Sequence, residues 1–87
     1  MPENRIIRNE DIERVTLAVP DGHQHLRATI TLKDGSEIVL QEATLANLSR
    51  AYVGLKTHPT RRSVVLVGRE VSDRKSGFAS WQLVEEP

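Results

Sequence analysis

The chain has 87 residues and no cysteine, and its 12 basic and 12 acidic side chains balance to a net charge of zero. This length fits one domain, and a chain so small buries only about 60–65% of the surface that its unfolded form exposes. The lack of cysteine excludes disulfides, thiol catalysis and zinc–thiolate sites. No apolar run approaches the roughly 18 residues of a transmembrane helix, and the charged start MPENRIIRNEDIER has no signal-peptide hydrophobic region. We therefore expect a cytoplasmic protein that does not bind membranes.

The first ten residues have no regular pattern, so we expect a loose leader over residues 1–10 and a single α+β domain over residues 11–87. Apolar and polar residues then alternate in ERVTLAVP, HLRATITLK and SEIVLQ, which is the period of half-buried strands. PDG and KDG separate these stretches. Both are turn sequences, because Asp caps its own turn and glycine accepts a positive φ.

The register of the first hairpin also decides the role of two neighbouring histidines. A slip of one residue would turn every side chain over, so the apolar faces favour a four-residue PDGH loop that pairs Leu17 with Leu26. This register places His23 in the loop and His25 on the polar side of the next strand. A zinc site needs three or four ligands, and the third histidine, His58, lies among cations. We therefore predict no metal site and no cofactor.

The apolar faces of the strands also decide the loop length of the second hairpin. A three-residue KDG loop pairs Leu32 with Ser36 and keeps the apolar side chains of both strands on one face. It also places Gly35 in the left-handed position of a bulge. We predict this form of the turn.

An amphipathic helix is predicted next, over about residues 44–56, with Thr44 as its N-cap. Pro59 bars its continuation. Its apolar stripe has the spacing of one helical face and consists of Leu45, Leu48, Tyr52 and Leu55. On this pattern Tyr52 belongs to the core, and so does Trp81, which shares a strand face with a leucine.

Two further strands follow, RSVVLVGREV and FASWQLVEE, joined by the polar loop SDRKSG. The predicted fold is therefore α+β, a single antiparallel sheet in the order β-β-β-α-β-β with one helix packed on one face. The run VVLV is apolar on both faces, and something must cover each of them. The cover is the N-terminal segment around Ile6 and Ile7, a second subunit, or the rest of a barrel-like sheet. The self-association residues predicted from this run are Val64, Val65, Leu66 and Val67.

The basic segment over residues 50–75 is the other functional candidate, because lysine and arginine neutralise phosphates. Its seven cations are Arg50, Lys56, Arg61, Arg62, Arg69, Arg74 and Lys75. The sequence pI of 6.8 is not the high value typical of nucleic-acid binders. Phosphate-binding and hydrolase motifs are absent from the sequence, and we predict no catalytic residues. The leading hypothesis is a non-enzymatic protein-interaction module that forms a homodimer or binds another protein, and the alternative is nucleic-acid binding.

Overall fold

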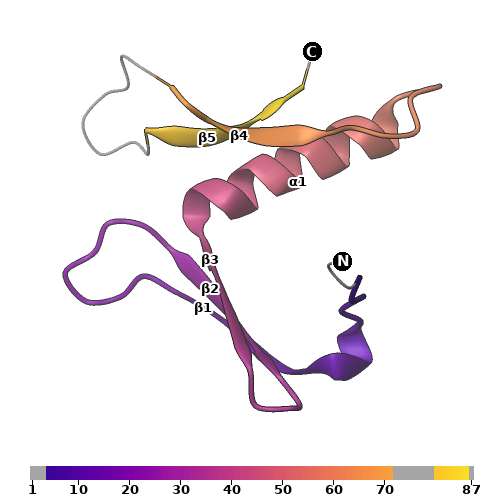
Figure 1. Cartoon of the computed structure of the whole chain (residues 1–87). Helices are drawn as coiled ribbons and strands as arrows, with labels where there is room; N and C mark the ends of the chain where they lie inside the picture. Colours follow the sequence, from indigo (N-terminus) through magenta and orange to yellow (C-terminus); the bar gives the residue numbers. More distant parts are fainter. Residues whose placement is uncertain (1–3, 72–79, 87) are drawn as a thin grey trace. The chain divides into compact units, whose positions relative to one another are not determined.

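A computed structural model describes residues 4–71 and 80–86 of the chain (Figure 1). A short 3-10 turn, Asn9–Asp11, precedes the first strand. The elements are then β1 (Ile12–Ala18), β2 (Arg27–Leu32), β3 (Glu37–Gln41), α1 (Glu42–Thr57), β4 (Leu66–Glu70) and β5 (Trp81–Glu85). The predicted α+β class, the β-β-β-α-β-β order and the antiparallel strands with a packed helix are confirmed.

The expected single sheet is wrong in one respect, because the strands hydrogen-bond as two sheets, β1-β2-β3 and β4-β5. Each strand pairs with the neighbour that its own hairpin brings to it, and the helix separates the two groups along the chain. The chain divides into two compact units, Met1–Leu40 and Gln41–Pro87. The single domain expected over residues 11–87 stays a prediction.

In the first unit, β1 and β2 pair two residues away from the expected register. Leu17 lies opposite Ala28 instead of Leu26, and residues 19–26 form a longer loop than the four residues predicted. The PDGH turn itself forms, since the backbone N–H of His23 donates to the carbonyl of Pro20 at 3.0 Å. A shift by two keeps every side chain on its expected face, so apolar matching could not distinguish the two registers.

The same correction applies to the second histidine, which was expected on a strand. His25 lies in the loop, because β2 begins only at Arg27. The core of this unit sits on the central strand β2, where Ala28 and Leu32 are 2% and 3% exposed. The outer strand β1 leaves Val15 and Leu17 exposed.

The turn between β2 and β3 has the predicted form. The N–H of Leu32 donates to the carbonyl of Ser36 at 2.9 Å, the N–H of Gly35 donates to the carbonyl of Leu32 at 3.0 Å, and Gly35 has a φ of 93°. Asp34 accepts hydrogen bonds from the hydroxyl and the backbone N–H of Ser36, at 2.6 and 2.9 Å. These bonds, with a smaller contribution from the Arg5 guanidinium at 3.2 Å, lower the pKa of Asp34 to about 2. Arg5 thereby ties part of the expected leader to this turn.

The second unit begins with a helix that is longer than predicted. The helix starts directly after β3 with Gln41 as its N-cap, so Thr44 lies inside it, and it runs past Gly54 to Thr57. His58 is its C-cap, and the side-chain Nδ1 of His58 accepts the N–H groups of Thr60 and Arg61 in the following turn at 3.2 and 2.8 Å. In the described part of the chain, no helix has the length and apolar character needed to cross a membrane.

The helix packs against the β4–β5 hairpin with a face that the apolar pattern did not predict. Asn47 is 9% exposed, and its amide Nδ2 donates to Oε1 of Gln82 on β5 at 3.0 Å. Ala51 and Leu55 continue this face at a spacing of four residues. The expected stripe is therefore wrong at its centre, because Leu48 and Tyr52 are 45% and 65% exposed.

The β4–β5 hairpin pairs Leu66 with Glu85 and Val67 with Val84. The pairing extends one residue beyond β4, since the N–H of Glu86 donates to the carbonyl of Val65 at 2.9 Å. Trp81, expected in the core, lies at the opposite end of β5 and is 60% exposed. This sheet contains only two strands, and an isolated two-stranded hairpin is marginally stable in water.

Candidate binding groove and sheet face

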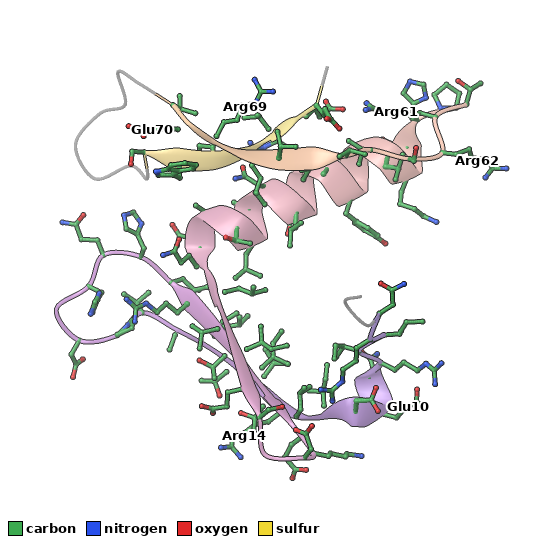
Figure 2. All side chains as sticks on the ribbon, in the orientation of Figure 1. Glu10, Arg14, Arg61, Arg62, Arg69 and Glu70 are labelled. Atoms are coloured by element: carbon green, nitrogen blue, oxygen red, sulfur yellow. The ribbon has the colours of Figure 1, made fainter. Side chains whose placement is uncertain are left out.

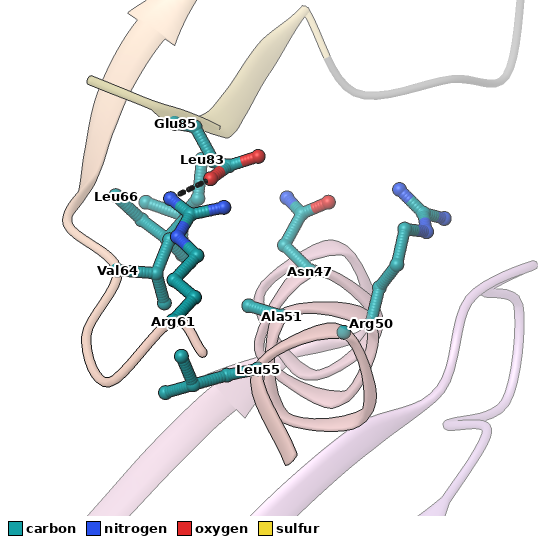
Figure 3. A pocket seen from close by; sticks show the side chains of 10 residues that line it. Asn47, Arg50, Ala51, Leu55, Arg61, Val64, Leu66, Leu83 and Glu85 are labelled. Carbon is teal, nitrogen blue, oxygen red and sulfur yellow. Dashed lines mark hydrogen bonds and ion pairs between the residues drawn. The ribbon is translucent and has the colours of Figure 1, made fainter. Parts of the chain in front are cut away.

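A groove of about 300 Å³ lies between α1 and the β4–β5 hairpin, within the second unit (Figure 3). The helix contributes small residues, Ala51 and Gly54, at the positions that face the groove. Because these side chains do not fill the space under the hairpin, the two elements leave a hollow. The remaining lining residues are Asn47, Arg50, Leu55, Arg61, Val64, Leu66, Leu83 and Glu85.

Charged groups line the groove from both sides, and they differ in whether they have an ion-pair partner. The guanidinium Nη2 of Arg61 donates to Oε1 of Glu85, and its Nε donates to the carbonyl of Ser63 at 3.1 Å. Figure 3 shows Arg50 separated from this pair by Asn47. Arg50 has no ion-pair partner among residues 4–71 and 80–86. The groove therefore carries one neutralised cation and one uncompensated cation.

The two sides of the β4–β5 sheet differ in their surroundings. Val64 and Leu66 line the groove on the helix side. Since successive side chains of a strand point to opposite faces, Val65 and Val67 lie on the other side, together with Val84, the cross-strand partner of Val67. Val65 is 55% exposed, and the other two are half-buried. These three residues, Val65, Val67 and Val84, form the outer valine patch, which combines the two residues of the VVLV run that do not line the groove with Val84 of β5.

The predicted basic segment does not form one cluster in the described residues. Figure 2 shows Arg61 and Arg62 beyond the C-terminal end of α1, whereas Arg69 lies on β4 beside Glu70. Lys56 is in the last turn of the helix. Arg74 and Lys75 lie outside the described residues. The cations that the structure describes are thus spread over the helix, the following loop and the hairpin.

Two of the three histidines lie in the loop over residues 19–26, and the third lies at the end of α1. His23 belongs to the PDGH turn, His25 to the bend that follows it, and His58 caps the helix. Among residues 4–71 and 80–86, no group of three His, Cys, Asp or Glu side chains could hold a metal ion.

The groove is the feature that sequence reasoning missed. Arg50, Arg61, Val64 and Leu66 were already candidates, but for phosphate contacts and self-association. The spacing of Asn47, Ala51 and Leu55 by four residues was visible in the sequence, but the more apolar stripe beside it gave the stronger signal. Comparison of the chain with protein families, curated proteins and solved structures finds no match.

Proposed function

We propose that this protein is a small non-enzymatic interaction module that self-associates through the outer valine patch of the β4–β5 sheet. The observation that supports it is the exposed Val65 beside the half-buried Val67 and Val84, on the side of the hairpin opposite the helix-lined groove. A second copy that places the same patch against this one would bury apolar side chains from both partners. Such a twofold contact is the commonest form of homo-oligomer.

The thin core gives an energetic reason for this association. The buried apolar side chains among the described residues are Ala28 and Leu32, both in the first unit. The β4–β5 sheet has one layer of helix against it and two strands, so its own burial is small. Burial of one more valine side chain contributes about 1.5–3 kcal/mol. Contact with a second copy would therefore supply stability that the hairpin lacks.

Sedimentation velocity from low to high micromolar concentration tests the proposal. We expect a reversible dimer, and we expect Val65→Lys to weaken the dimer by roughly tenfold or more, because an ammonium group would be buried in the contact. Tyr52→Lys is the matched control, since Tyr52 is an exposed apolar residue on the helix. Circular dichroism verifies that both variants fold.

Two results would overturn the proposal. One is a wild-type protein that stays monomeric over the whole concentration range. The other is a dimer that survives Val65→Lys and dissociates with Tyr52→Lys, which would assign the contact to the helix.

Nucleic-acid binding is the alternative, and one observation favours it. Lys56, Arg62 and Arg69 have no ion-pair partner among residues 4–71 and 80–86, so these cations are available to phosphates. Titration of labelled DNA and RNA at two salt concentrations tests it. Binding that weakens steeply with salt and with Arg62→Gln plus Arg69→Gln would support the alternative, and no binding at low salt would end it.

A further inference from the structure

The groove has an apolar part beside its charged and polar groups, and it is only partly filled. Beyond the small residues of the helix, this apolar part consists of the aliphatic side chains Leu55, Val64, Leu66 and Leu83. A Cβ atom added at Gly54 would meet no heavy atom within 4 Å, so open space lies directly above this glycine. The volume of about 300 Å³ is at the small end of the range for small-molecule sites. These walls suit an aliphatic chain of moderate length.

The polar groups of the groove favour a ligand with a single negative charge. Arg61 is occupied by Glu85 and by the carbonyl of Ser63, so its charge is already compensated. One N–H of the Asn47 amide is donated to Oε1 of Gln82. Arg50 is the remaining cation of the groove among the described residues. A guanidinium binds a carboxylate in a planar, bidentate arrangement.

We propose that this groove binds a medium-chain aliphatic carboxylate, with the chain against the leucine and valine walls and the carboxylate on Arg50. A nucleotide fits the site less well, because among residues 4–71 and 80–86 one uncompensated cation would face several phosphate charges and no aromatic side chain lines the groove for stacking. The groove and the outer valine patch lie on opposite sides of the hairpin. The ligand proposal therefore does not depend on self-association.

Decanoate is the probe, and NMR of the ¹⁵N-labelled protein follows its binding below the micellar concentration. We expect saturable shifts at the backbone amides of Ala51, Gly54 and Leu83. Arg50→Gln should weaken decanoate binding about tenfold, since a hydrogen bond to a charged group contributes roughly 1.5–3 kcal/mol. Arg62→Gln removes a cation that does not line the groove and should leave the affinity unchanged.

Two further measurements separate the contribution of the ligand's carboxylate from that of its aliphatic chain. Decanol should bind wild type about as weakly as decanoate binds the Arg50→Gln variant, because neither pair can form the charged contact. Gly54→Leu places a large side chain in the open space and should abolish binding of both compounds. Leucine is a good helix former, so this variant should retain the helix.

Three outcomes would overturn the inference. The first is no saturable shift with decanoate. The second is equal affinity for decanoate in wild type and Arg50→Gln, which would exclude the carboxylate contact. The third is a set of shifts that centres on Val65 and Val84, which would place the ligand on the outer patch. Because sedimentation reports the dimer separately, failure of this inference is distinguishable from failure of the proposed self-association.

Discussion

The two units of this chain bury different kinds of residue. In Met1–Leu40 the buried positions are the apolar Ala28 and Leu32 on the central strand, whereas in Gln41–Pro87 the buried position among the described residues is the polar Asn47. In the first unit the buried side chains lie on β2, the central strand between β1 and β3. The second unit joins a helix and a hairpin through small residues and a hydrogen bond. The difference shows that burial in the first unit centres on the middle strand of a sheet, whereas burial in the second unit depends on which face of the helix packs against the hairpin.

The largest expected effect tests the apolar core of the first unit. Leu32→Ala should lower the free energy of unfolding by about 2–5 kcal/mol, because Leu32 is almost fully buried and its removal leaves a cavity. Leu48→Ala, at an exposed leucine of the helix, should cost no more than about 0.5 kcal/mol. Urea unfolding followed by circular dichroism measures both. Equal losses would mean that the exposed helix stripe is covered in solution.

A pair of glycine substitutions should give effects of opposite sign in the two units. Gly35→Ala should destabilise the protein by about 1–2 kcal/mol, because the φ of 93° is strained for a residue with a Cβ atom. Gly54→Ala should stabilise it by about 0.5–1 kcal/mol, since glycine weakens a helix interior and the added methyl meets open space. Thermal unfolding measures both. A loss at Gly54 would show that the groove is narrower than described.

The polar contact between helix and hairpin is the next test. Asn47→Ala should lower the free energy of unfolding by about 1–2 kcal/mol, because Gln82 loses a partner across the packing face. A double-mutant cycle with Gln82→Ala isolates this contact from the other interactions of Gln82. Additive losses would mean that the hydrogen bond does not stabilise the unit.

The smallest effect is a pH dependence at the turn of the first unit. The pKa of Asp34 is lowered from 3.8 to about 2, chiefly by the hydroxyl and backbone N–H of Ser36. The ionised form is therefore favoured by folding, so its stabilising effect is present above pH 3.8 and is lost as the pH falls toward 2. Asp34→Asn should remove this part of the acid dependence of the unfolding midpoint. Ser36→Ala should raise the pKa toward its ordinary value, as NMR titration of the carboxyl carbon would show, and an unchanged pKa would contradict the assignment to Ser36.

Some features followed from the sequence because their causes are local. The KDG turn has one glycine at the position that needs a positive φ, and a slip of one residue would separate the apolar residues of its flanking strands. The order of the elements followed from periodicity and turn residues. The face of each strand followed as well, since alternation has a period of two and tolerates no slip of a single residue.

Other features required the tertiary structure. A two-residue slip of β1 against β2 preserves every face, so only the full set of backbone hydrogen bonds selects between Leu26 and Ala28 as the partner of Leu17. The packing face of α1 was likewise undetermined, because Tyr52 and Leu48 are more apolar than Asn47 and Ala51, yet the smaller residues let the hairpin approach. The groove forms because this face of α1, and not the more apolar one, packs against the hairpin. The sequence alone thus determined the order of the elements, the KDG turn and the alternation of strand faces, whereas contacts between elements decided the length of the first loop and its register, the buried helix face and the site.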